Sequence, residues 1–256
     1  MATSNNAQVI RVRRVEELNG LPKGMSFFDP IIPHETEEAL EAGGEVYVST
    51  TPSGEKNGLL IYDEWEATGT IFTKSRDSFE RLFAMKPDSY IFSELDVPRE
   101  PREDWNLWEL DVDRAIPSHR FKHHVAMADD AKEIEQFMEA TQPGTNPRWI
   151  AVALRHGDRC FVTRVNNRIV GMAWMTIAGR VARSHGLYVE PRFRKMGVMK
   201  DNFEARLIYL KSKGVHTLIN EIAASNVPSS KHAEKIGENV VGRIFLYATP
   251  EPSPSE

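Results

Sequence analysis

The chain has 256 residues, of which 41% are hydrophobic and 27% are charged, a composition typical of a soluble globular protein with one large domain or two small ones. Its 32 basic and 37 acidic residues give a formal net charge of −5, which argues against a general nucleic-acid-binding protein. A single cysteine, Cys160, excludes an intramolecular disulfide and a metal site built from several thiolates.

The sequence shows no run that is long enough to cross a membrane. The longest uncharged apolar stretch is 169–179, whereas a membrane-spanning helix needs about 20 such residues. The first residues are polar and lack the apolar region of a signal peptide. We therefore expect a cytoplasmic protein without a membrane partner. Residues 249–256 contain three prolines, and we expect them to form a disordered tail.

The first half of the chain predicts short strands and one helix. The helix, at 75–85, follows the third of these strands, and its apolar side chains recur at the spacing of one helix face. The strands are expected at 45–50, 59–62, 70–73 and 89–95.

The middle of the chain, at 96–117, marks a change of composition because prolines and charges concentrate there. Trp105 and Trp108 lie within this stretch, and two such large aromatic side chains indicate a segment that packs against the protein. We therefore expect an N-terminal domain at 1–118 and a second domain at 119–248.

The second half shows a clearer alternation of strands and helices. Asp129 and Asp130 are candidate caps for a helix that begins at Ala131, and Asn166-Asn167 is typical of a tight hairpin turn. Strands are expected at 161–165, 169–177, 181–189, 216–222 and 240–247, and later helices at 199–213 and from Pro228 to Gly237. The two halves share an order of elements, which suggests an internal structural repeat.

Residues 187–199 have a pattern that is typical of an anion-binding site at the start of a helix. A strand ends at Pro191, a basic loop with Gly197 follows, and then a helix begins. The first backbone amides of a helix have no partner within it and carry positive partial charge, so they bind anions such as a pyrophosphate. Gly197 lets the backbone approach such a group closely, and Arg194 and Lys195 add positive charge.

This segment resembles the phosphate loop of the GNAT superfamily, the acyl-coenzyme A-dependent N-acyltransferases. The family loop reads Gln/Arg-x-x-Gly-x-Gly/Ala, and residues 194–199 read Arg-Lys-Met-Gly-Val-Met. The preceding Gly-Leu-Tyr-Val-Glu-Pro, at 186–191, has the form of the family's strand. Residues 226–237 are similar to the family's Asn-x-x-Ala…Tyr-x-x-x-Gly helix. The resemblance covers about residues 119–248.

Two residues of this half depart from the family pattern. Met199 stands where the family has Gly or Ala, and Ala233 stands where many members have a tyrosine that protonates the departing thiolate. In the N-terminal half, only Lys74-Ser75 separates the strand from the helix, without a glycine loop. That half therefore resembles a degenerate GNAT domain, as in tandem members similar to glycine N-acyltransferases, and we expect it not to bind coenzyme A.

The resemblance implies a mixed α+β fold in tandem, with a central, mostly antiparallel sheet flanked by helices. It implies a transferase, specifically an acyltransferase that moves an acetyl or other acyl group from coenzyme A to an amine by direct attack in a ternary complex. The acceptor is expected to be a small molecule or amino acid. Whether it carries an anionic group is an open question at this point. The alternatives are a non-catalytic acyl-coenzyme A-binding or regulatory protein, or an enzyme that acetylates protein lysines or N-termini. The oligomeric state is also an open question, and a homodimer is one alternative.

His185 is the leading candidate for the general base because an imidazole titrates near neutral pH, and Glu221 on the next strand is its competitor. The alternative is that His185 is a structural residue of its strand. For Asn226, a contact with the pantetheine arm of the cofactor competes with a simple helix cap. The residues expected to bind acetyl-coenzyme A are Leu187, Tyr188, Val189, Arg194, Lys195, Met196, Gly197, Val198, Met199, Asn226 and Ser229.

We expect no metal cofactor. The histidines at 119, 123 and 124 lack acidic or thiolate partners at ligand spacing. Arg180 and Arg183 either are solvated residues at the edge of the sheet or bind an anionic group of the acceptor. Cys160 is expected to be a small buried hydrophobe.

Overall fold

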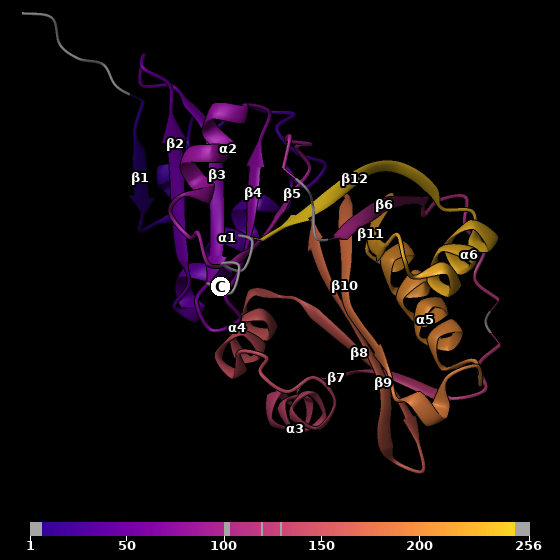
Figure 1. Cartoon of the computed structure of the whole chain (residues 1–256). Helices are drawn as coiled ribbons and strands as arrows, with labels where there is room; N and C mark the ends of the chain where they lie inside the picture. Colours follow the sequence, from indigo (N-terminus) through magenta and orange to yellow (C-terminus); the bar gives the residue numbers. More distant parts are fainter. Residues whose placement is uncertain (1–6, 100–102, 119, 129, 249–256) are drawn as a thin grey trace, which may run out of the picture. The chain divides into compact units, whose positions relative to one another are not determined.

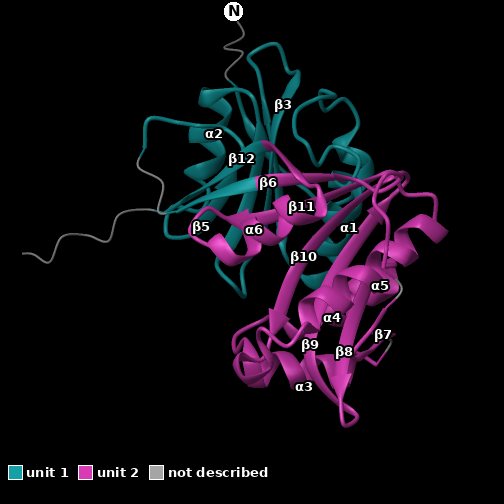
Figure 2. Ribbon diagram, turned by 90° about the vertical axis from the view of Figure 1, so that its right-hand side faces the viewer, with its two compact units in different colours: residues 1–106, 242–256 teal, residues 107–241 magenta. Residues whose placement is uncertain are grey.

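A computed structural model describes residues 7–99, 103–118, 120–128 and 130–248 of the chain (Figure 1). The chain forms two compact units, and Figure 2 distinguishes them by colour. Unit 1 comprises residues 1–106 and 242–256, and unit 2 comprises residues 107–241. The domain limits expected from the sequence, with a division at residue 119, stay a prediction. The expected tail, His119 and the cap Asp129 lie outside the described residues.

Unit 1 is built on a mostly antiparallel sheet with the strand order β1-β2-β3-β4-β5-β12. The strands are β1 (Val9–Val12), β2 (Glu45–Thr50), β3 (Lys56–Asp63), β4 (Thr68–Thr73), β5 (Tyr90–Ser93) and β12 (Asn239–Tyr247). Its helical segments are η1 (Val15–Leu18), α1 (Ile32–Ala42) and α2 (Arg76–Phe83). β4 and β5 are parallel because α2 carries the chain back between them.

Tyr247, at the end of β12, locks the last strand into the core of unit 1. Its side chain is fully buried, and its ring meets Phe79 of α2 edge to face at 5.2 Å between centroids. Its hydroxyl donates to the Leu95 carbonyl at 3.0 Å and accepts from the Val97 amide at 3.1 Å. One phenol therefore satisfies two backbone groups of the segment that follows β5.

In unit 2 the strands of the sheet follow one another in the order β6-β11-β10-β9-β8-β7. The strands are β6 (Glu103–Asp111), β7 (His124–Ala128), β8 (Arg159–Val165), β9 (Arg168–Ala178), β10 (Val181–Val189) and β11 (Thr217–Ala223). The helices are α3 (Ala131–Thr141), α4 (Pro147–His156), α5 (Val198–Ser212) and α6 (Val227–Ile236), with a single helical turn, η2, at Pro191–Phe193. β10 and β11 are parallel, and α5 connects them.

Helices cover both faces of the unit 2 sheet, as Figure 1 shows, and the strand residues alternate between them. Cys160 and Val162 of β8 pack with α3 and α4 on one face. Phe161, between them, packs with α5 on the other face. Cys160 is fully buried, as expected, and burial raises the pKa of its thiol to about 12. The described helices include none with the length and apolar composition needed to span a membrane.

The mixed α+β fold expected from the sequence is confirmed, and so is the shared order of elements. Each unit runs through a strand, a helical segment, three antiparallel strands, a helix and a parallel strand. The strands predicted at 45–50 and 181–189 have the observed bounds. Asp130 caps α3 through the amides of Lys132 and Glu133, and both asparagines of the hairpin have positive φ.

The sequence interpretation missed three strands, β1, β6 and β7, and two α-helices, α1 and α4. In the case of β6, the prolines around it suggested a boundary, although residues 103–111 contain none. The missed helix α4 does carry local signals. Asn146 caps its start by accepting from the Arg148 amide at 3.0 Å, and Gly157 ends it at a φ of 105°.

The Tyr247 hydroxyl is a testable anchor of unit 1. Tyr247→Phe keeps the ring but leaves the Leu95 carbonyl and the Val97 amide without their partner, so we expect a loss of about 1–3 kcal/mol in the free energy of unfolding. Urea denaturation followed by circular dichroism would measure it. An unchanged midpoint and slope would contradict the role of this hydroxyl.

Candidate functional site

The site in unit 2 begins where β10 and β11 separate. Their parallel register runs from Val181 opposite Thr217 to Ser184 opposite Asn220, although both strands continue beyond that pair. On its other side, β10 shifts its register with β9 between His185 and Tyr188. The two residues inside this bulge lie out of register with β9, so the ladder on that side of β10 is interrupted just beyond the point where β10 and β11 separate.

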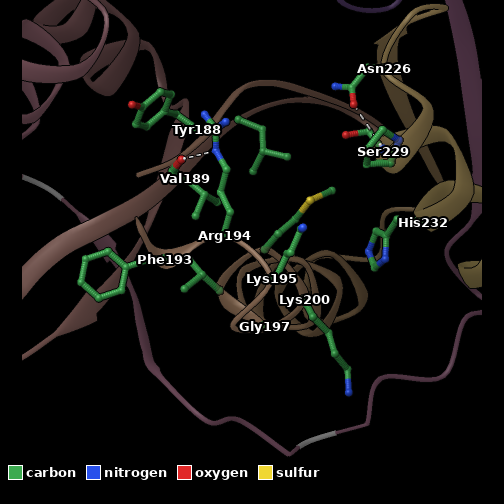
Figure 3. Close-up of a pocket in the computed structure, with 14 residues that line it drawn as sticks. Tyr188, Val189, Phe193, Arg194, Lys195, Gly197, Lys200, Asn226, Ser229 and His232 are labelled. Atoms are coloured by element: carbon green, nitrogen blue, oxygen red, sulfur yellow. Dashed lines mark hydrogen bonds between the residues drawn. The ribbon is translucent and has the colours of Figure 1, made fainter. Parts of the chain in front are cut away.

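A cleft of about 640 Å³ lies between the end of β10 and the first turns of α5 and α6 (Figure 3). Of the residues expected to bind acetyl-coenzyme A, all but Met196 line it. Met196 is 51% exposed and is not part of the lining. The structure also brings in four residues that the sequence interpretation did not select: Phe193, Lys200, Pro228 and His232.

The loop before α5 has the backbone conformation of an anion site. Lys195 and Gly197 have φ values of 64° and 95°, and left-handed residues at such close spacing turn backbone amides toward one side. The first intrahelical bond runs from the Asp201 amide to the Gly197 carbonyl, so the amides of the preceding turn remain open. Arg194 braces the loop by donating from Nε to the Val189 carbonyl at 3.1 Å, as Figure 3 shows.

Glycine is required at 197 by its conformation and not by lack of space. A Cβ built there would meet only Lys122 Cδ, at 3.9 Å. In contrast, Gly171 of β9 is required by close packing, because a Cβ there would lie 2.7 Å from Val198 Cγ1. The absence of a side chain at 171 therefore lets the start of α5 approach the sheet.

Asp201 ties the start of α5 to the segment that leads into β7. Its buried carboxylate accepts from the amides of Lys122 and His123, both at 2.9 Å, and lies 2.7 Å from His123 Nδ1. His123 therefore has a structural role beside the phosphate loop. His124 of β7 is exposed.

At the start of α6, Asn226 accepts from the Ser229 amide at 3.3 Å (Figure 3). Asn226 is thus a helix cap that also lines the cleft, and its contact with a cofactor arm stays a prediction. Ala233, at the position of the family's tyrosine, is buried in unit 2. The preceding residue, His232, lines the cleft instead, and burial together with the charges of Lys235 and Arg206 lowers the pKa of its imidazole.

His185 has a defined tautomer in this structure. Thr176 Oγ1 donates to the buried Asp158 Oδ2 at 2.9 Å, and the same oxygen lies 3.2 Å from His185 Nε2. Because a hydroxyl has one proton, Thr176 accepts from the Nε2–H of His185. Nδ1 is then the nitrogen with a free lone pair. The ring of Trp149 packs beside the imidazole, with 5.9 Å between centroids.

Glu221, the competing base, is engaged in an ion pair. Its two oxygens contact Arg183, through Nε at Oε1 and through Nη2 at Oε2 at 3.1 Å. A carboxylate whose two oxygens are both held by a guanidinium is less free to approach a substrate. The geometry therefore favours His185 over Glu221, and it places Arg183 in a pair with Glu221.

Two charged groups lie buried behind the point where the strands separate. Arg206 of α5 donates from Nη1 to Ser184 Oγ of β10, and burial lowers the pKa of its guanidinium to about 10. Asn220 of β11 donates from Nδ2 to Glu238 Oε1 at 2.6 Å. Burial raises the pKa of Glu238 to about 7, although the charge of Arg206 and the Asn220 hydrogen bond act in the opposite direction.

Unit 2 therefore combines separated parallel strands with a loop that presents open helix-start amides to a cleft. Residues 124–237 match the model of the acetyltransferase (GNAT) family, so the chain carries a GNAT domain. No curated protein sequence matches the chain significantly.

Solved structures show where the fold recurs. A tandem GNAT protein from the clavulanic acid biosynthesis pathway is similar over 98% of this chain and 100% of its own, with 12% identity and a TM-score of 0.62. A GNAT acetyltransferase from Colwellia psychrerythraea covers 93% and 98%, with 12% identity and a TM-score of 0.58. A GCN5-related N-acetyltransferase from Sphaerobacter thermophilus covers 82% and 84%, with 14% identity and a TM-score of 0.55. At these identities the likeness shows the fold.

The phosphate loop can be tested at Gly197. We expect Gly197→Glu to weaken binding of coenzyme A by about a hundredfold or more, because it puts a carboxylate among the phosphates and strains a φ of 95°. Calorimetric titration would measure this. Gly214→Glu is the matched control, because Gly214 also has positive φ and open space but follows the other end of α5. Equal affinities of the two variants would contradict the assignment.

The buried carboxyl of Glu238 predicts a pH dependence of stability. Its folded pKa, about 7, lies above the ordinary value of 4.5, so the unfolded chain loses this proton first as the pH rises. The contribution of Glu238 to stability therefore falls between these two values, by on the order of 3 kcal/mol in total. We expect Glu238→Gln to become more stable relative to the unmodified protein as the pH rises from 5 to 8. A constant difference in denaturation across that range would be the contrary result.

Proposed function

We propose that this protein is an N-acetyltransferase that moves an acetyl group from acetyl-coenzyme A to the amine of a small molecule or amino acid. One observation carries the proposal. The cleft of unit 2 is lined by open helix-start amides at one end and lies alongside the separated strands that lead to His185. The GNAT domain and fold support acyl transfer in general, and the geometry supports the roles given to single residues.

The cofactor is proposed to lie along β10. Its phosphates meet the amides and cations of residues 194–199, and its pantetheine arm passes between β10 and the start of α6, where Asn226 lies. From Glu190 back to His185 is five residues, or about 17 Å at ~3.3 Å per residue. An extended pantetheine arm has a comparable length, so the thioester reaches the neighbourhood of His185.

The reaction is proposed to take place beside His185, two residues before Leu187, the first residue of β10 that lines the cleft. Nδ1 of His185 takes a proton from the acceptor ammonium, and the free amine attacks the thioester carbonyl. The C–N bond forms, the C–S bond breaks, and coenzyme A leaves as its thiolate, which takes up the second proton that the attacking nitrogen loses as the amide forms. Amides that the bulge of β10 leaves out of register stabilise the negative charge that develops on the carbonyl oxygen.

Thr176 and Asp158 support His185 in this scheme. Once Nδ1 takes up a proton, the imidazolium is stabilised by the carboxylate of Asp158, whose Oδ2 lies 3.6 Å from Nε2. The hydroxyl of Thr176 bridges the two groups and keeps the ring oriented. His185 is thus a base that is oriented by the hydroxyl of Thr176, which is in turn held by Asp158.

Two variants test the base. We expect His185→Gln to lower the rate by ~10²–10⁴, because general-base catalysis is lost. We expect Thr176→Val, which removes only the bridging hydroxyl, to lower kcat by about tenfold without a change in coenzyme A affinity. The assay is thiol release from acetyl-coenzyme A with a panel of amines.

The control is His216→Gln, because His216 pairs with Asp113 before the start of β11 and takes no part in the contacts of His185 with Thr176 and Asp158. It should keep the full rate. If His185→Gln also keeps the full rate, His185 is not the base, and Glu221 would be tested next. If the unmodified protein binds acetyl-coenzyme A but releases no thiol with any amine or with a lysine peptide, the protein is a non-catalytic binder.

A further inference from the structure

The last paired residues of the separating strands face the helices that form the cleft. Ser184 and Asn220 are the final register pair of β10 and β11. Ala182 and Leu218, two residues earlier on each strand, belong to the core beneath α5. Because strand side chains alternate, Ser184 and Asn220 point toward the same face.

Each of these two residues is held by a buried charged group. Arg206, from the middle of α5, donates to Ser184 Oγ. Glu238, directly after the end of α6, accepts from Asn220 Nδ2 at 2.6 Å. The Glu238 amide also donates to the Ala233 carbonyl of α6, at 3.0 Å. Each strand is therefore fixed, at its point of separation, to one of the two helices whose first turns line the cleft.

Arg206 and Glu238 are charged groups that are almost completely buried, and this burial lowers the free energy of unfolding. Arg206 is 2% exposed and Glu238 is 5% exposed. Removing a guanidinium and a carboxylate from water costs several kcal/mol each, and an apolar pair of similar volume is often at least as stable. In the part of the chain that the structure describes, Arg206 Nε and Glu238 Oε2 have no hydrogen-bond partner. Their mutual attraction acts across a poorly screened interior.

The pair is also coupled to the groups around the cleft. The charge of Arg206 contributes to lowering the pKa of His232, which lines the cleft from α6. The residues that follow Ser184 and Asn220 on each strand are His185 and Glu221, the two candidate bases, which face the opposite side of the sheet. A shift at the point of separation would therefore move both the cleft and the base.

We propose that Arg206 and Glu238 form a buried charge clamp that positions β10 and β11 where they separate and so shapes the part of the cleft that receives the pantetheine arm. They are positioning residues. This inference rests on the proposed function, because it concerns coenzyme A binding in the same cleft. The clamp acts on the gap between the strands and not on the phosphate loop, which lies at the other end.

The test compares coenzyme A with adenosine 3′,5′-bisphosphate, its nucleotide part without the pantetheine arm. The clamp is replaced by an apolar pair, Arg206→Met with Glu238→Leu. We expect calorimetric titration to show coenzyme A binding weakened by about tenfold, or ~1.4 kcal/mol, and bisphosphate binding unchanged. A purely structural role would weaken both ligands together or neither.

The matched control replaces Arg164 with Met and Glu133 with Leu. That bidentate pair joins β8 to α3, with both contacts at 2.5 Å, and it does not line the cleft. It should change neither affinity. Thermal unfolding of each variant shows that it is folded. If the clamp replacement does not fold, Glu238→Gln at pH 8 takes its place, because it keeps an acceptor for Asn220 and removes the charge; a loss confined to coenzyme A is again expected.

The outcomes separate the clamp from the proposed function. If the unmodified protein binds neither ligand, the proposed coenzyme A site is wrong and the clamp falls with it. If it binds both, and the variant keeps its full affinity for coenzyme A, the clamp alone is wrong. An equal loss for both ligands also overturns the clamp, because the replacement then acts on the cleft as a whole.

Discussion

The hydrogen-bonding requirement of the β10 backbone governs unit 2. Buried N–H and C=O groups need partners, and β10 exchanges its ladder bonds with β11 only as far as Ser184. Beyond that residue the two strands separate, and the register with β9 slips by a bulge. A gap with unpaired backbone groups is a natural place for an extended ligand that has its own polar groups. The cleft therefore forms because the hydrogen bonds between β10 and β11 stop at Ser184, before the end of either strand.

One helix serves three parts of this arrangement. The first turn of α5 presents open amides to the cleft, and its middle carries Arg206 behind the sheet. Its apolar side packs into the core through Phe203, Leu207 and Leu210. The helix is fixed near its start by Asp201, so the amides, the guanidinium and the core contacts move as one body. The turn of α5 that borders the cleft is thus joined through one helix to the core of the unit.

Local signals in the sequence predicted the loop and its strand, while the supporting residues could not be predicted. Gly197 and Pro191 mark a strand-to-helix junction by their own conformational limits, so the junction is readable from a few neighbouring residues. The contacts of Arg206 with Ser184 and of Thr176 with Asp158 join residues 22 and 18 positions apart. Only the fold makes them neighbours, and nothing in their local sequence distinguishes them from other polar residues.

The two units share an order of elements, yet their helix starts differ in what the first amides meet. In unit 1, Ser75 caps α2 by accepting from the Ser78 amide at 3.3 Å, so the chain itself satisfies a group that an anion would need. In unit 2, the residue in the same position is Gly197, and no side chain of the described residues caps α5. The hydroxyl of Ser75 occupies an amide at the start of α2, whereas Gly197 has no side chain that could do so at the start of α5. The amides of α5 are therefore available to a ligand. Both units therefore have the parallel strand pair, whereas the helix start without a side-chain cap, which an anion site requires, lies in the second.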